Sequence, residues 1–143
     1  MLVTPDTSQL SEIFSHAAAP AFLLGAVAGF TSILHGRLIG LVERIRSLND
    51  IGDDDEKRLI LKDDVPLLKS RVRLLVSAIY LALCSAICTT LLLAFSFLAA
   101  FFEWSHELGA AMLFLFAVVL LGISLVRFAQ EIHIGLSEAD HYR

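Results

Sequence analysis

Three long stretches without a single charged residue dominate this sequence, at residues 17–34, 74–102 and 108–126. A helix needs about 17–25 predominantly apolar residues to cross the hydrocarbon core of a bilayer, so each stretch is long enough to do so. The whole chain is 57% hydrophobic, against about 45–50% in soluble domains. We therefore predict an all-α membrane protein with three transmembrane helices, folded as a single membrane domain over residues 1–143.

The basic residues orient the chain in the membrane. Nine of the eleven Lys and Arg residues lie between Arg37 and Arg73, and Arg127 follows the third apolar stretch. Cytoplasmic loops carry an excess of Lys and Arg, whereas residues 1–20 carry none. We predict a multi-pass protein with its N-terminus outside and its C-terminus in the cytoplasm. The net charge of −4 argues against a nucleic-acid partner.

Apolar residues continue at helical spacing beyond the predicted spans, which cover about residues 17–36, 74–102 and 108–127. This periodicity predicts helical extensions into the cytoplasm. They comprise a helical hairpin over about residues 37–73, which includes a short helix at about 54–64, and a C-terminal helix over about 128–138. Pro20 is predicted to mark the start of the first span, because a first helical turn tolerates its missing N–H. Leu23, Val27 and Leu34 are predicted to face lipid.

Small residues recur on two of the predicted spans. On the first span they are Ala21, Gly25, Gly29, Gly36 and Gly40. On the second they are Ala78, Ala82 and Ala86. Such stripes let membrane helices approach closely, so we predict that the two stripes are helix-packing surfaces and that one is the counterpart of the other. The alternative is that glycine is simply common in membrane helices.

Ionisable side chains meet at the predicted inner membrane boundary. We predict a network there of Arg37, Glu43, Arg44, Arg127 and Glu131. Charges near a membrane core usually pair with one another or line a pathway, so the network is a candidate for gating or assembly. The alternative is that Arg37 and Arg127 only mark the boundary and extend toward water, with Glu131 as a solvated partner.

Two functions are compatible with this architecture. Three spans enclose no sizeable polar path, so the leading interpretation is a homo-oligomer that forms a pore, lined by Ser77, Ser85 and Thr89. The alternative is an accessory or scaffold subunit that packs against a larger membrane complex and transports nothing. Membrane lipid is a partner under both. We expect no enzymatic activity, because the sequence has no nucleophile with an adjacent base and no phosphate-binding loop.

Metal and cofactor sites are not expected. The alternative is a divalent-metal site on the outer side, where Glu103, His106 and Glu107 have helical spacing. A bend in the loop between antiparallel spans would break that spacing, so we predict no metal site there. Cys84 and Cys88 lie four residues apart within the second span and are interpreted as small packing residues. The run from Asp53 to Glu56 lacks the alternating ligands and the central glycine of a calcium loop.

Several spaced motifs resemble the family catalogued as domain of unknown function 2721. They are Pro20-Ala21-Phe22-Leu23-Leu24-Gly25, Arg37-Leu38, Val42-Glu43-Arg44-Ile45-Arg46-Ser47-Leu48, the basic residues within 68–75, and Glu131 within 128–132. The resemblance covers nearly the whole chain and implies a small bacterial inner-membrane protein with three spans. The chain departs from the family at His35-Gly36-Arg37, where an Asn-Arg pair is usual, and at Gly40, where a second Arg is usual. The family carries no assigned activity.

Overall fold

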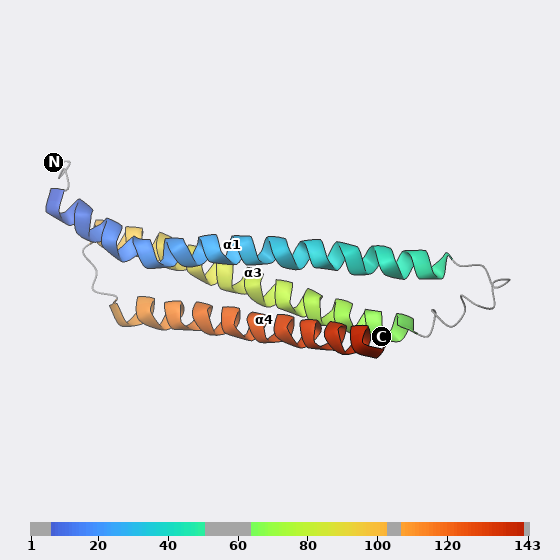
Figure 1. The fold of residues 1–143 in the computed structure, drawn as a ribbon. Helices are drawn as coiled ribbons and strands as arrows, with labels where there is room; N and C mark the ends of the chain where they lie inside the picture. The colour runs from blue at the N-terminus through green and yellow to red at the C-terminus, as the bar shows by residue number, and fades with distance from the viewer. Residues whose placement is uncertain (1–6, 51–63, 103–106, 142–143) are drawn as a thin grey trace.

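The structure of the chain is a computed structural model that describes residues 7–50, 64–102 and 107–141. This part of the chain forms three long α-helices, which are α1 (Thr7–Asn49), α3 (Val65–Phe102) and α4 (Glu107–His141). Successive helices run antiparallel and lie side by side over most of their length (Figure 1). The predicted all-α fold with three long helices is confirmed. The short helix predicted at about residues 54–64 lies almost entirely outside the described residues.

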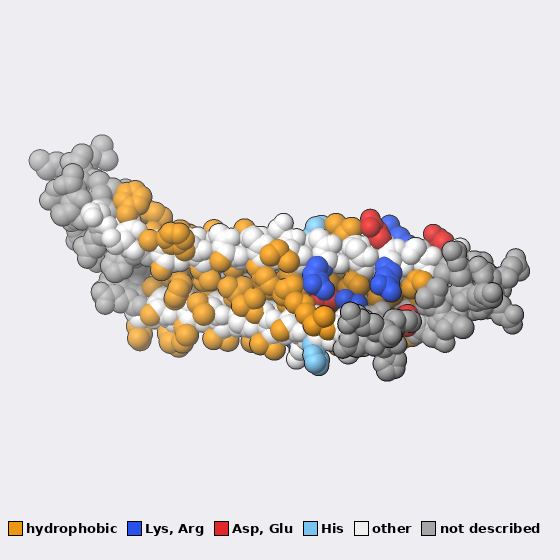
Figure 2. Space-filling view, in the orientation of Figure 1, with side chains coloured by type: hydrophobic (Ala, Val, Ile, Leu, Met, Phe, Trp, Pro, Cys, Tyr) orange, Lys and Arg blue, Asp and Glu red, His pale blue; other side chains and the backbone are white. Residues whose placement is uncertain are grey.

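Each helix contains a segment that is long and apolar enough to cross a membrane. The segments are Ala17–Asn49, Val65–Ala99 and Leu108–Ser137. Their charged side chains gather at one end of the bundle, which we call the polar end, where α1 and α4 finish and α3 begins (Figure 2). Away from that end, the face that Figure 2 shows carries many hydrophobic side chains and no charged side chain among the described residues. The chain is therefore a multi-pass membrane protein.

Buried positions follow a seven-residue period, which identifies α3 as the central helix. On α1 the buried hydrophobic residues are Val27, Leu34, Leu41 and Leu48, and on α4 the buried line is Ala117, Ser124 and Glu131. On α3 the intervals alternate between three and four residues through Leu68, Arg71, Leu75, Ala78, Ala82, Ser85, Thr89 and Leu92. This is the spacing of coiled-coil seams. Helix α3 packs against both neighbours, whereas α1 and α4 barely touch.

Two expectations for α1 are wrong. Helix α1 begins at Thr7, so Pro20 lies inside the helix and does not start it. An internal proline removes one backbone hydrogen bond and commonly bends a helix, and Figure 1 shows α1 bending in its N-terminal part. Val27 and Leu34 were expected to face lipid but are buried, because the seven-residue seam carries them against α3.

The helices pack together beyond their uncharged stretches. Leu41, Leu48 and Leu68 belong to one apolar cluster with Leu34 and Leu75, so the ends of α1 and α3 that carry charged residues share a core. The connection of the predicted hairpin, residues 51–63, lies outside the described residues. Helix α4 continues past Arg127 to His141.

Helix α4 approaches α3 closely through small residues. The Ser124 hydroxyl donates to the carbonyl of Ala78 at 2.6 Å, and the Ser85 hydroxyl donates to the carbonyl of Ala117 at 2.7 Å. A side chain as short as serine reaches a neighbouring backbone only where two helices lie in direct contact. Small residues and hydroxyl bonds replace the hydrophobic effect between helices within a membrane.

Candidate functional site: a buried carboxylate clamp

One carboxylate joins all three helices near the polar end. Glu131 on α4 is completely buried. Its Oε1 accepts two hydrogen bonds from Arg71 on α3, from Nε at 3.0 Å and from Nη2 at 2.8 Å. Arg37 on α1 approaches from the other side, with Nη2 at 3.3 Å from Oε2 and 3.5 Å from Oε1. We call these three residues the Glu131 clamp.

The seams of the helices direct these side chains inward. Glu131 occupies the next position on the buried line of α4, seven residues after Ser124. Arg71 lies between Leu68 and Leu75 on the seam of α3, whereas the neighbouring basic residues Lys69 and Arg73 are exposed. The charged groups therefore occupy core positions that leucine or alanine fills elsewhere on the same lines.

A glycine on α4 makes room for the Arg71 guanidinium. A Cβ atom added to Gly135 would lie 2.6 Å from Nη2 and 2.9 Å from Cζ of Arg71. Gly135 is one helical turn beyond Glu131, so the guanidinium lies against the backbone of α4 while it donates to the carboxylate. Any larger residue at position 135 forces Arg71 to move.

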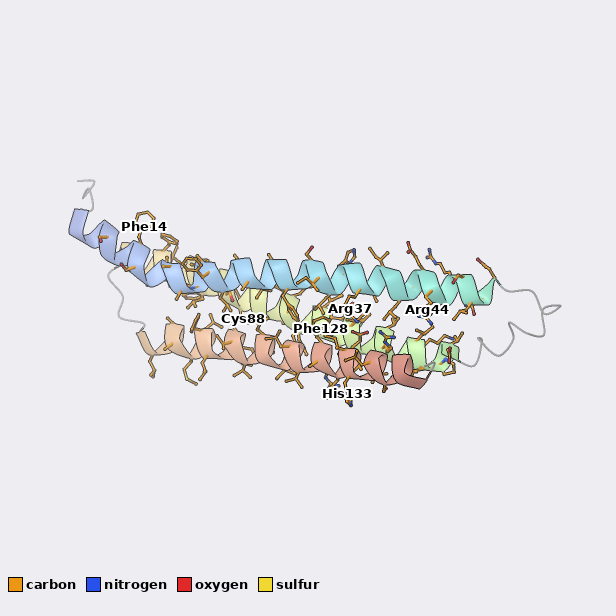
Figure 3. The ribbon with its side chains drawn as sticks, in the orientation of Figure 1. Phe14, Arg37, Arg44, Cys88, Phe128 and His133 are labelled. Carbon is orange, nitrogen blue, oxygen red and sulfur yellow. The ribbon has the colours of Figure 1, made fainter. Side chains whose placement is uncertain are left out.

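Two aromatic rings hold Arg37 in place where α1 reaches α4. The Arg37 guanidinium lies over the Phe128 ring at 5.5 Å from its centroid. Phe30 of α1 meets the same ring edge to face, with centroids 5.6 Å apart. Figure 3 shows Arg37 and Phe128 close together between α1 and α4. A cation over an aromatic face is attracted by about 0.5–2 kcal/mol, which favours one orientation of the guanidinium.

The two arginines differ in exposure. The Arg71 side chain is 10% exposed, whereas 40% of the Arg37 side chain is exposed. Arg71 makes the shorter contacts with Glu131, and Arg37 is a second cation beside the same carboxylate. The Oε2 atom of Glu131 is buried and accepts no hydrogen bond from the described residues, and its 3.3 Å contact with Arg37 is an ion pair.

The structure brings together two of the five residues predicted to form the charge network. Arg37 and Glu131 are ion-paired. Arg44 is exposed and lies two turns further along the same side of α1 (Figure 3). Glu43 and Arg127 are exposed, and within the described part of the chain neither forms a hydrogen bond or an ion pair. Arg127 points outward because the adjacent Phe128 occupies the side of α4 that faces α1.

Arg71 was not among the predicted site residues, although the sequence contains a signal for it. Lys69, Arg71 and Arg73 alternate along α3, but only Arg71 is three residues from Leu68 and four from Leu75. The buried positions of α3 alternate at intervals of three and four residues. When this alternation is continued from Leu75 toward the start of α3, the next buried position is Arg71.

The residues predicted to line a pore have a different role. Ser85 and Thr89 are completely buried on the α3 seam, where Ser85 bonds to α4 and Thr89 bonds to the carbonyl of Ser85. Both side chains are therefore enclosed by the chain's own helices, and this position does not support the prediction that they line a passage. Ser77 is half-buried and bonds to the carbonyl of Leu74 within its own helix.

The two small-residue stripes do not meet. Ala78 and Ala82 are completely buried on α3, and Ala86 is half-buried. The first stripe is exposed throughout, at Ala21, Gly25, Gly29, Gly36 and Gly40. A Cβ added to any of these four glycines would meet no atom within 4 Å. The predicted pairing of the stripes is wrong, because α1 packs on α3 through its larger seam residues.

An open apolar groove of about 460 Å³ lies between α1 and α3. Its lining includes Ala28, Ser32 and His35 of α1 with Leu83 and Ala86 of α3. No cluster of three or more His, Cys, Asp or Glu side chains occurs within the described residues. Glu103 and His106 lie outside the described residues, and so does the side chain of Glu107.

Comparison with known proteins yields one match. The family model described as "Protein of unknown function (DUF2721)" matches residues 17–141. That range contains the three apolar segments and every residue of the Glu131 clamp. No curated protein and no solved structure matches the chain. Because the match covers most of the 143 residues, this multi-pass membrane protein belongs to the DUF2721 family.

Proposed function

We propose that this chain is a self-associating protein of the bacterial inner membrane, in which the glycines of α1 form the contact surface between copies. The observation that carries the proposal is the exposed small-residue stripe on α1. None of Gly25, Gly29, Gly36 and Gly40 has an atom within 4 Å of an added Cβ, so the chain's own helices leave this face uncovered. Its role is structural, as a packing subunit of a membrane assembly.

The position of the glycines on α1 supports this role. At about 100° per residue, the four glycines lie roughly 180–240° around the helix from Leu34. Leu34 is completely buried against α3, so the glycines occupy the opposite side. Gly25 with Gly29 and Gly36 with Gly40 are two pairs with the spacing that lets membrane helices cross in direct backbone contact.

A second copy is the partner best matched to this face. Glycine pairs at four-residue spacing are self-complementary, since each helix offers the other a shallow surface without side chains. A two-fold contact between copies uses the same patch on both, and closed two-fold dimers are the commonest oligomers. A larger membrane protein with its own small-residue helix is the alternative partner, which the experiment below distinguishes.

A packing role is better supported than a pore. The hydroxyl side chains that were candidates for a lining are used between α3 and α4. The described surface of the apolar segments away from the polar end carries mainly large hydrophobic residues such as Phe22, Leu91 and Phe116. We expect neither ion conduction nor enzymatic activity, because Glu131, the buried carboxylate of the described residues, is paired internally with arginine.

Replacement of Gly29 by Leu tests the proposed surface. We expect the mass in mild detergent, measured by native mass spectrometry, to fall from an oligomer to a monomer because leucine keeps the helices apart. Gly122→Leu on α4 is the matched control, since Gly122 is equally exposed and equally open. An unchanged oligomer mass in the Gly29→Leu variant contradicts the proposal.

Ion flux across the membrane of liposomes that contain the protein distinguishes a packing subunit from a pore. Wild-type oligomers without flux support a packing subunit, whereas flux that the Gly29→Leu variant abolishes supports a pore. Stoichiometric recovery with a different membrane protein, and no self-association, identifies an accessory subunit instead.

The proposed orientation places the polar end in the cytoplasm, because the basic residues gather there. A reporter fused after Arg143 is expected to be cytoplasmic, and a reporter inserted at Ser105 is expected to be external. The opposite result for both reporters reverses the assigned orientation without affecting the packing proposal.

A further inference from the structure

The exposed side of the Glu131 clamp is formed by Arg37, whose side chain is 40% exposed. Arg71 donates two short hydrogen bonds to Glu131, at 3.0 and 2.8 Å. Arg37 makes only longer contacts to the same carboxylate, at 3.3 and 3.5 Å. Two guanidinium groups therefore share one carboxylate, and the exposed one contributes least to neutralising it.

Arg37 has hydrogen-bond donors to spare. Its polar contacts within the described part of the chain all use Nη2, and there Nε and Nη1 donate to no atom. The ring of Phe128 lies against the guanidinium and restricts its orientation. A guanidinium with free N–H groups, held in a fixed orientation and 40% exposed, is suited to bind two oxygens of one anion.

The position of Arg37 along the bundle identifies the anion. The uncharged stretches of α1 and α4 end just before Arg37 and Arg127. Among the described residues of these two helices, most of the exposed large apolar side chains precede the two arginines, and Ile39 and Leu136 lie beyond them. Arg37 is about 20 residues from Ala17, where the apolar segment of α1 begins, so it reaches the level of lipid phosphates at one end of a span. Basic side chains between helices at this level commonly bind the head groups of anionic lipids.

We propose that Arg37 binds the phosphate of an anionic phospholipid, with its acyl chains along the apolar surface of α1 and α4. The clamp positions the arginine, because Glu131 contacts Nη2 and the Phe128 ring lies against the plane of the guanidinium. The lipid phosphate accepts hydrogen bonds from the outer N–H groups. This lipid site uses none of the glycines in the proposed contact surface of α1, so it does not depend on self-association.

Lipid binding to purified, delipidated protein tests the site. We expect phosphatidylglycerol to bind about tenfold more tightly than phosphatidylcholine, as measured by native mass spectrometry, because a charge-assisted hydrogen-bond pair contributes about one power of ten. Arg37→Gln should abolish this preference. Arg127→Gln is the matched control, because it removes the same charge at a similar level from an exposed arginine outside the clamp, and it should retain the preference.

Arg37→Lys keeps the positive charge and provides a second test if the Arg37→Gln variant does not fold. Because lysine lacks the planar pair of donors, we expect an intermediate preference. A wild-type protein without preference for phosphatidylglycerol overturns the proposal, as does an equal loss in the Arg37 and Arg127 variants. Displacement of phosphatidylglycerol by an equal concentration of inorganic phosphate identifies a soluble anion as the ligand and also overturns it.

Discussion

Gly135→Ala is the sharpest test of the Glu131 clamp, because the change adds a single methyl group. That methyl carbon would lie 2.6 Å from Nη2 of Arg71, so the guanidinium must recede by roughly 0.8 Å to reach an ordinary contact distance. It has no room to move toward Glu131, since the bond from Nη2 to Oε1 is already 2.8 Å long. We expect at least one of the two bonds from Arg71 to break.

The magnitude follows from two opposing terms. Loss of one hydrogen bond to a charged group costs about 1.5–3 kcal/mol. Replacing glycine by alanine in a helix stabilises by about 0.5–1 kcal/mol. The net expectation is a decrease of about 1–2 kcal/mol in the free energy of unfolding. The guanidinium is the far end of a flexible side chain, but burial and the bonds to Glu131 make its displacement costly.

The assay is equilibrium unfolding in detergent by titration with dodecyl sulfate, followed by circular dichroism. Gly122→Ala on the same helix is the control, because an added Cβ there meets nothing within 4 Å, and it should stabilise the fold slightly. The two substitutions are therefore expected to have opposite signs. Equal stabilisation by both would refute the reasoning. In a Glu131→Gln background the cost of Gly135→Ala should shrink, since the charged acceptor is gone.

Three further comparisons use the same unfolding assay. Leu34→Ala should lower the free energy of unfolding by about 2–4 kcal/mol, because it leaves a cavity in the core, whereas Ile33→Ala on the exposed side should change it by less than about 0.5 kcal/mol. Ser124→Ala removes one bond between α3 and α4 and should cost about 0.6 kcal/mol; a cost above about 2 kcal/mol would contradict this interpretation. Arg71→Gln should cost about 3 kcal/mol or more, because it leaves Glu131 with only the longer contacts of Arg37. Arg73→Gln should be nearly neutral, and equal effects of the two substitutions would contradict the assignment of Arg71 to the core.

The helices could be predicted from sequence because their signal is long and redundant. Each apolar run spans many residues, and the ends at Asn49 and Val65 coincide with changes in composition. The start of α1 was missed because Pro20 is a strong local signal for a first turn. The thirteen residues before it nevertheless continue the helix.

Which face of a helix points inward was harder to predict. Within a membrane both the core and the lipid surface are apolar, so Val27 and Phe22 look alike in composition although one is buried and the other exposed. Only the seven-residue interval separates them. The polarity of Ser85 marked it as a candidate functional residue but did not reveal its partner. A hydroxyl group can bond to a neighbouring helix as well as line a water-filled path. Glu131 and Arg37 were recognisable by their level along the spans, whereas Arg71 required the interval pattern of α3.

The buried charge of Glu131 in the seam of α4 has a consequence for the uniqueness of the fold. A seam built from repeating leucine and alanine offers nearly the same packing if one helix slides by seven residues, or about 10 Å. Such alternatives are close in energy because lipid does not favour one apolar contact over another. A slide of α4 by seven residues would place Glu131 opposite Ala78 in one direction, and in the other direction it would leave Arg71 facing Ser124, so the short bonds between Arg71 and Glu131 would be lost either way. The clamp therefore removes the degeneracy of the seam and selects one axial alignment of the three helices.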